Sequence, residues 1–196
     1  MSASITLNKV KRGVFVESEV RVVDEKTVFQ GLRFSVVRRR YQYKERSFAR
    51  DIVLFPESSV VVPFLNESEI ILIRQFRAPL GGYILELPAG VVDKGEKPED
   101  TARRELVEET GYYPRKLTKL TTVYPVPGYS TEIMHIYEAE DLEFKGAKPE
   151  PYELIETVKV EFREALNQVF RGEIRDAKSV IGIMISGLKR GFIRVK

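Results

Sequence analysis

Three glutamates are spaced i, i+3 and i+4 near the middle of the chain: Glu105, Glu108 and Glu109. Pro98 precedes them and Gly111 follows, which predicts a helix because proline favours the first turn and glycine the C-terminal end. On such a helix the three carboxylates share one face and repel one another. A hard divalent cation such as Mg²⁺ would relieve that repulsion by taking the oxygen ligands. Taken alone, the run is better explained as a solvated acidic helix face.

The residues around the glutamates favour metal binding, because they belong to a longer pattern. It runs from Gly90 to Tyr112 and reads GVVDKGEKPEDTARRELVEETGY, with Glu96 and the core Arg104–Glu109 in register. This pattern resembles the Nudix box, the signature of the Nudix hydrolase family. Every fixed polar or glycine position matches, and the one departure is Tyr112, where the family usually has an aliphatic residue. The resemblance implies hydrolysis of a diphosphate linkage.

The same conclusion follows from the chemistry of a diphosphate, whose negative charge repels an attacking water until cations neutralise it. Glu105 and Glu109, one helical turn apart, are the first-choice ligands for Mg²⁺, Mn²⁺ or another divalent cation, and Glu108 is the third. The resemblance implies the Ala89 carbonyl as a further ligand, which side-chain patterns do not reveal.

Segments outside the box resemble one branch of the family, the ADP-ribose pyrophosphatases. Gln75–Arg77 and Glu86–Gly90 are similar to the segment before the box in that branch, and Arg175–Ser179 is similar to its final helix. Pro127 stands sixteen residues after Gly111, the spacing that marks the branch. The resemblance implies Mg²⁺-dependent cleavage of ADP-ribose to AMP and ribose 5-phosphate. The alternatives are another nucleoside-diphosphate sugar such as GDP-mannose, a dinucleotide such as FAD, a non-catalytic nucleotide-binding module, or an RNA-directed role.

Catalytic roles are expected on the box helix and on a later loop. Arg104 is predicted to orient the carboxylates through Glu96, with an ordinary surface ion pair as the alternative. In related ADP-ribose pyrophosphatases a glutamate on a late loop activates or positions water. Glu153 is the candidate for that role here, with Glu150 and Glu108 as alternatives.

Substrate contacts are expected from residues on several segments. Arg77 and Arg50 offer guanidinium forks for phosphate and ribose groups, since that fork matches anionic oxygens. Glu86 is a candidate for an adenine or ribose hydroxyl edge. Glu132, which follows the turn at Pro127, is expected to contact the substrate, and Gly90 is grouped with these residues.

The composition argues against several other functions. The 196 residues include no cysteine and one histidine, which argues against disulfides, thiolate or His-based zinc sites and a Ser-His triad. No apolar run has the length of a membrane span, and no signal-peptide apolar region is present, so we predict a cytoplasmic location without a membrane partner. The net charge is +3, but acidic residues interrupt the basic clusters. Nucleic acid is therefore disfavoured relative to solvated surfaces, dimer contacts and a small anionic substrate.

The order of strands, box helix, strands and late helices predicts a mixed α/β (α+β) fold. The resemblance implies the Nudix fold, a mixed β-sheet sandwiched between helices, for residues 58–196. Residues 1–57 are predicted to form an antiparallel β region, with alternating runs at Val14–Val23 and Thr27–Tyr43 and a turn at Asp24–Lys26. Because two or three strands alone are marginally stable, this region needs a packing partner. The resemblance implies a homodimer in which it reaches the second subunit.

Within residues 58–196, alternation and turn residues predict a series of elements. The expected strands are Val60–Leu65, Ile70–Ile73, Tyr83–Leu87, Leu117–Val123, Ile133–Ala139 and Thr157–Val160, with a charged loop over Asp141–Pro151 and late helices over Arg163–Arg171 and Asp176–Arg190. The last helix is predicted to present a core face at helical spacing, formed by Ile181, Met184, Ile185 and Leu188.

Overall fold

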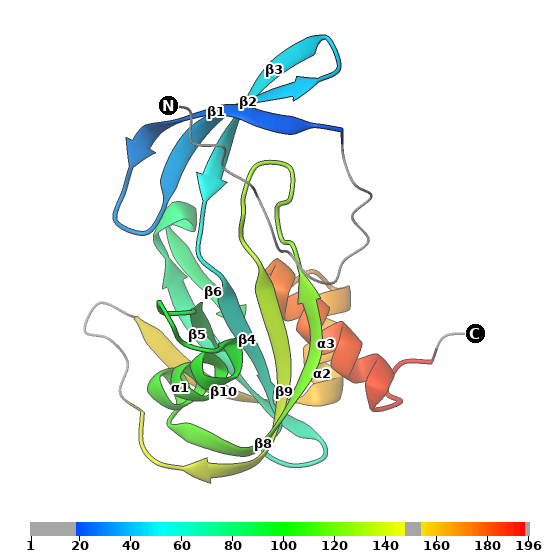
Figure 1. The fold of residues 1–196 in the computed structure, drawn as a ribbon. Coiled ribbons are helices and arrows are strands. Elements are labelled where there is room, and N and C mark those ends of the chain that lie inside the picture. Colours follow the sequence, from blue (N-terminus) through cyan, green and yellow to red (C-terminus); the bar gives the residue numbers. More distant parts are fainter. Residues whose placement is uncertain (1–18, 148–153, 195–196) are drawn as a thin grey trace. The chain divides into compact units, whose positions relative to one another are not determined.

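The computed structural model describes residues 19–147 and 154–194, so Glu150 and Glu153 lie outside the described residues. The described chain divides into two compact units, one formed by residues 19–55 and 126–131 and the other by residues 56–125 and 132–194. Both units are drawn in Figure 1. Within the described ranges, none of the helices combines the length and the apolar character that crossing a bilayer requires.

The first unit is an antiparallel sheet in the order β1-β2-β3, with strands β1 (Arg21–Gln30), β2 (Ser35–Tyr43) and β3 (Arg46–Leu54). The predicted turn at Asp24–Lys26 is wrong, because β1 continues through it and the chain turns at residues 31–34. The two acidic residues of that stretch, Asp24 and Glu25, face Arg40 and Arg39 of β2, and Glu25 forms an ion pair with Arg39, whereas Lys26 faces Arg38. Opposite charges on facing strands stabilise a sheet, so this polar run is strand rather than turn.

A segment from much later in the chain belongs to the same unit. The Val53 N–H donates to the Tyr129 carbonyl at 2.7 Å, and the Thr131 N–H donates to the Val53 carbonyl at 3.0 Å. The loop that contains Pro127 therefore lies along β3. The predicted boundary between residues 57 and 58 assigns this later segment to the second unit instead.

The second unit contains two sheets and three helices. One sheet has the order β7-β4-β9-β8, in which β4 and β9 are parallel and the other pairs antiparallel, and the second is antiparallel in the order β10-β5-β6. Its elements are β4 (Ser58–Pro63), β5 (Glu69–Arg77), the short 3₁₀ helix η1 (Ala78–Leu80), β6 (Gly82–Glu86), β7 (Ala89–Val91), α1 (Pro98–Thr110), β8 (Tyr112–Val123), β9 (Met134–Phe144), β10 (Ile155–Glu161), α2 (Phe162–Phe170) and α3 (Ala177–Lys189).

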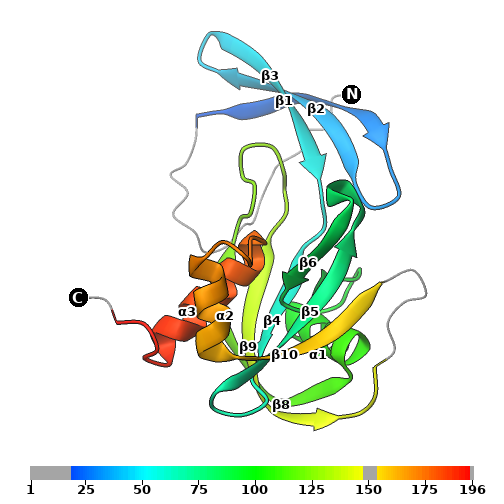
Figure 2. The same cartoon turned by 180° about the vertical axis from the view of Figure 1, so that it is seen from behind.

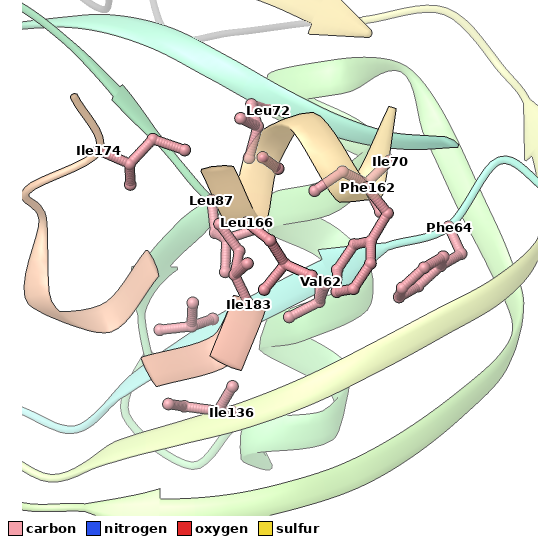
Figure 3. Close-up of a cluster of buried hydrophobic side chains, with 12 residues drawn as sticks. Val62, Phe64, Ile70, Leu72, Leu87, Ile136, Phe162, Leu166, Ile174 and Ile183 are labelled. Carbon is pink, nitrogen blue, oxygen red and sulfur yellow. The ribbon is translucent and has the colours of Figure 1, made fainter. Parts of the chain in front are cut away.

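Helices cover both faces of the mixed sheet, as its central strand shows. Val60 and Val62 of β4 belong to the cluster formed with α2 and α3, which Figure 3 draws. Val61 points the other way and packs with Ala102 and Leu106 of α1. Successive residues of a strand face opposite sides, so α1 and the α2–α3 pair lie on opposite faces, as Figures 1 and 2 show. The predicted sandwich is confirmed.

The predicted elements of this unit are present, and the largest differences in their boundaries are at the start of β8 and the end of β9. Strand β8 begins at Tyr112, directly after the box helix, and β9 extends to Phe144. These two residues are register partners, and their rings make an edge contact at 5.1 Å between centroids. The start of the predicted charged loop, Asp141–Phe144, is therefore strand. The short strand β7 was not predicted, because three residues carry too little alternation to be recognised.

Helix α3 presents part of the predicted core face, since Ile181 and Met184 pack against the core cluster. Its fully buried positions are mostly small or polar, namely Lys178, Ser179, Gly182, Ile183, Ser186 and Gly187. A Cβ atom on Gly182 would lie 2.7 Å from Leu87 Cδ1 and 3.0 Å from Val62 Cγ2, so the helix packs very closely on the sheet. Leu188, predicted to be core, is 42% exposed. A stripe of apolar residues identifies the core face of a helix only where side chains fill the space between helix and sheet. At Gly182 the helix backbone itself lies against the sheet.

Candidate functional site

The box helix α1 begins and ends as its sequence predicts. Pro98 occupies the first turn, and Gly111 closes the helix in the left-handed conformation, at φ 81°, with its N–H donating to the Val107 carbonyl at 2.8 Å. The Ser59 hydroxyl of β4 donates to the Pro98 carbonyl at 2.6 Å. The helix is thus fixed to the central strand at the end opposite its glutamates.

Two of the helix glutamates lie against strand β7. The Ala89 N–H donates to Glu109 Oε2 at 3.0 Å, and Glu109 is 3% exposed. A Cβ atom placed on Gly90 would lie 1.9 Å from Glu105 Cδ and Oε1, so the Glu105 carboxylate occupies the space that a side chain would need. The two first-choice metal ligands are therefore brought to neighbouring residues of one strand.

Arg104 connects the remaining acidic residues of the box. Its Nε and Nη2 donate to the two oxygens of Glu96 at 3.1 and 3.0 Å. Its Nη1 donates to Glu105 Oε1 at 2.7 Å and to Glu108 Oε2 at 3.1 Å. The expected contact with Glu96 is present, and Arg104 also contacts two glutamates directly. That Arg104 orients the carboxylates during catalysis stays a prediction.

The charge network acts most strongly on Glu96. Its hydrogen bonds with Arg104 lower the pKa of Glu96 to about 2, and bonds from the Thr101 hydroxyl at 2.7 Å and the Asp93 N–H at 3.3 Å act in the same direction. The same interactions raise the pKa of Arg104, so this ion pair stays charged across the physiological range. The loop before α1 is thereby fixed to the helix through one carboxylate.

Glu96→Gln is expected to destabilise the protein in a pH-dependent way. The folded-state pKa lies below the ordinary value of 4.5, so ionised Glu96 stabilises the folded state fully above about pH 4.5, and this contribution is lost as the pH falls toward 2. Urea unfolding of the wild type and the variant should therefore differ most at neutral pH and converge in acid. Glu67→Gln, in the exposed β4–β5 turn, is the control. A Glu96→Gln deficit of equal size at pH 7 and pH 2.5 would contradict the prediction.

The donor atoms at this site are oxygens, the type of ligand atom that a hard divalent cation prefers. Glu105, Glu108 and Glu109 offer carboxylate oxygens beside the backbone of β7, and Mg²⁺ and Mn²⁺ take oxygen ligands. In the part of the chain that the structure describes, no three such groups converge into a metal-binding cluster, and two of these glutamates, Glu105 and Glu108, form ion pairs with Arg104. The assignment of these glutamates and of the Ala89 carbonyl as metal ligands stays a prediction.

A second charged cluster lies at the end of β6. The buried Glu86 accepts hydrogen bonds from Arg77 Nε and Nη2, both at 2.6 Å, and forms an ion pair with Lys178 of α3. Glu86 and Arg77, both predicted to contact the substrate, are thus brought together, with Glu86 bonded to two protein cations. The sequence analysis did not identify Lys178 as a site residue, although the resemblance to the final helix of related enzymes includes it.

The two clusters influence each other electrostatically. The bond with Glu86 is the main cause that raises the pKa of Arg77, and the charges of Asp176 and Glu109 act in the same direction. Burial raises the pKa of Glu132, and the nearby Lys178 partly opposes that shift. Glu132 also accepts a hydrogen bond from the Ser58 hydroxyl at 3.3 Å. Predicted residues from four segments of the second unit, Arg77, Glu86, Glu109 and Glu132, therefore belong to one electrostatic neighbourhood.

Two predicted residues are not part of this neighbourhood as described. Arg50 lies on β3 in the other unit, where its Nη1 donates to the Ala49 carbonyl at 2.8 Å. Its guanidinium carbon lies 5.1 Å from the centroid of the Phe48 ring. Glu153 lies outside the described residues, as does its alternative Glu150.

Comparison with known proteins identifies the family and the fold. The family model described as the NUDIX domain matches residues 55–180. The chain is 44% identical over 142 residues to the ADP-ribose pyrophosphatase of Bacillus subtilis, covering 71% of this chain and 77% of that protein. It is 33% identical over 170 residues to the GDP-mannose pyrophosphatase of Klebsiella pneumoniae, covering 80% and 81%. A crystal structure of an ADP compounds hydrolase shares the fold, with a TM-score of 0.78 at 23% identity over 90% of this chain and 97% of that one. With a family match over more than half of its length, the chain belongs to the Nudix family.

Proposed function

We propose that this protein hydrolyses the diphosphate bond of ADP-ribose to give AMP and ribose 5-phosphate. The observation that carries the proposal is the placement of Glu105 and Glu109 against neighbouring residues of β7. Arg77 offers an anion-binding group in the same neighbourhood, since the charge of Glu109 helps to raise its pKa. The choice of ADP-ribose is supported by the 44% identical Bacillus subtilis protein, which is named for that activity.

The residues of the box would hold the divalent cation, for which Mg²⁺ and Mn²⁺ are the first candidates. Glu105, Glu109 and Glu108 supply carboxylates, and the Ala89 carbonyl supplies a backbone oxygen. A bound cation neutralises the charge of the diphosphate and lowers the pKa of a water ligand. Arg104 limits repulsion between Glu105 and Glu108 by donating to both. The base that activates the water stays a prediction, with Glu153 first and Glu150 and Glu108 as alternatives.

The substrate would be bound outside the box. Arg77 is suited to a phosphate oxygen because its guanidinium is oriented by Glu86 and remains partly exposed, at 34% of its side chain. Glu132 is suited to a hydroxyl group, since burial favours its protonated form. Gly90 leaves room for the Glu105 carboxylate against the β7 backbone, and its contact with the substrate stays a prediction. Arg50 belongs to the other unit, and its contact with the substrate also stays a prediction.

Purified protein with Mg²⁺ is expected to convert ADP-ribose to equimolar AMP and ribose 5-phosphate, measured by chromatography. In water enriched in ¹⁸O the label should enter one of the two phosphate products, because water attacks phosphorus. GDP-mannose and FAD at the same concentration are the specificity controls. A higher kcat/KM for GDP-mannose would favour the activity after which the Klebsiella pneumoniae relative is named. ADP-ribose binding in calorimetry without product would favour a non-catalytic module instead.

The first unit is suited to contact a second subunit. Its sheet and the β1–β2 turn expose several large apolar side chains, among them Val23 and Phe29 of β1 and Leu32 of the turn, which are 55%, 52% and 108% exposed. Such a surface favours association, which supports the predicted homodimer. The predicted cytoplasmic location, and a role in nucleotide metabolism without nucleic-acid partners, stay predictions.

A further inference from the structure

A buried charge cluster joins helix α3 to the end of strand β6. We refer to Arg77, Glu86, Asp176 and Lys178 as the Lys178 cluster. Lys178 forms ion pairs with Glu86 and, at 2.8 Å, with Asp176, and its side chain is 8% exposed. Asp176 caps the same helix by accepting from the Ser179 N–H at 3.0 Å. The cluster therefore fixes the first turn of α3 to Glu86.

The charges of the Lys178 cluster balance only when all four members are present. Two carboxylates face two cations, and the Glu86 side chain is 1% exposed. Burying an ionised carboxylate is costly unless opposite charges and hydrogen bonds compensate for it. With Lys178 removed, Arg77 alone would face Glu86, and it would be drawn toward the protein interior rather than toward a ligand.

Arg77 has an unused edge in this arrangement. Its Nε and Nη2 are bonded to Glu86, while Nη1 makes no hydrogen bond to any residue within 19–147 and 154–194. A fork held from one side by a carboxylate presents its other N–H groups in a fixed direction, which reduces the ordering cost of binding an anionic oxygen. The orientation of that edge depends on Glu86, and the position of Glu86 depends on Lys178.

We infer that Lys178 is a positioning residue for substrate binding: it holds Glu86 so that Glu86 presents Arg77 to a phosphate oxygen of the diphosphate. The inference rests on the proposed function. It assigns α3, which is remote from the box in sequence, a role in KM rather than in the chemical step. The same helix offers a matched control, because Lys189 at its other end contacts a different buried glutamate, Glu138, at 3.3 Å.

Lys178→Met is expected to raise KM for ADP-ribose about tenfold or more and to leave kcat within about threefold, since one charge-assisted contact to the substrate is weakened. Arg77→Ala should raise KM at least as much. In the double variant, Lys178→Met should raise KM no further, because the residue acts only through Arg77. Lys189→Met should keep the wild-type KM.

A neutral pair of substitutions separates positioning from folding. Lys178→Met alone leaves the buried Glu86 with Arg77 as its one cationic partner and is expected to lower the melting temperature. Glu86→Gln/Lys178→Met removes both charges, should recover most of that stability, and should keep the raised KM because the Arg77 fork is no longer held by a carboxylate. Recovery of the wild-type KM in this pair would overturn the inference, as would additive effects of Lys178→Met and Arg77→Ala.

The inference and the proposed function fail in different ways. Wild-type protein that neither hydrolyses ADP-ribose nor binds its α,β-methylene analogue in calorimetry contradicts the proposed function, and the inference with it. Wild-type turnover combined with an unchanged KM in Lys178→Met contradicts the role of Lys178 alone. An unchanged KM in Arg77→Ala also overturns the inference, because Lys178 would then have no substrate contact to position.

Discussion

Glu109→Gln is expected to lower kcat for ADP-ribose by about 10³-fold, because losing a ligand weakens stabilisation by the metal by several kcal/mol. The substitution changes charge with little change in shape. A glutamine oxygen can still accept the 3.0 Å hydrogen bond from the Ala89 N–H, so the buried contact that fixes α1 to β7 is kept. What is lost is the negative charge beside β7. Steady-state kinetics at saturating Mg²⁺ measure the effect, and Mn²⁺ binding by calorimetry should weaken in parallel.

The matched control for Glu109→Gln lies on the same helix. Asp100→Asn makes the same chemical change in the exposed first turn of α1, away from the glutamates, and should keep wild-type kcat. Glu105→Gln should resemble Glu109→Gln. If Glu109→Gln keeps more than a tenth of wild-type kcat, Glu109 is not a ligand for the catalytic metal, and its bond to Ala89 is structural only.

The box helix could be predicted from sequence because each of its signals is local. Proline at the start, glycine at the end and glutamates at helical spacing all lie within one stretch, and α1 has the predicted bounds. The sandwich was implied by the family resemblance, and the buried run of β4 supplies residues for both of its faces. The contact of Arg104 with Glu96 was also predicted, whereas its contact with Glu108, one helical turn later at 3.1 Å, was not.

The other site features depend on contacts between distant segments, which no local pattern records. Lys178 meets Glu86 across 92 positions of sequence, and β7 is recognised as a strand only by its pairing with β4. The core face of α3 was predicted only in part, because the close packing at Gly182 depends on Leu87 and the sheet. The turn predicted at Asp24–Lys26 is strand because Asp24 and Glu25 face arginines of the partner strand.

The contacts of the segment Glu86–Ala89 show how the residues just before the box are held against its helix. Glu86 is held by Arg77 and Lys178, and the next residue, Leu87, donates its N–H to the Ser179 hydroxyl at 2.7 Å. Two residues later, the Ala89 N–H meets Glu109. The segment that brings its backbone to the glutamates of α1 is therefore anchored by α3. Substrate binding and metal binding would share one short stretch of chain, with separate supports on either side of the sheet.

Gly90→Ala is expected to lower kcat by about 10²-fold or more while the fold persists, since displacing one ligand costs several kcal/mol at the metal. The added Cβ would lie 1.9 Å from Glu105 Oε1 and 2.4 Å from Oε2, distances that real Cβ atoms do not reach. The clash is with the end of a flexible side chain rather than with backbone, so the Glu105 carboxylate moves and β7 stays in place. Circular dichroism and the melting temperature should therefore change little.

The mechanism of Gly90→Ala can be isolated by combining it with Glu105→Gln. If the methyl group acts by displacing the Glu105 carboxylate, the double variant should be no slower than the slower of the two single variants, because both changes remove the same interaction. Gly82→Ala is the control, since a Cβ there meets no atom within 4 Å. Additive losses in the double variant would mean that Gly90 acts on the substrate directly, as its grouping with the substrate-binding residues predicts. Non-additive losses would mean that Gly90 acts by leaving space for the Glu105 carboxylate.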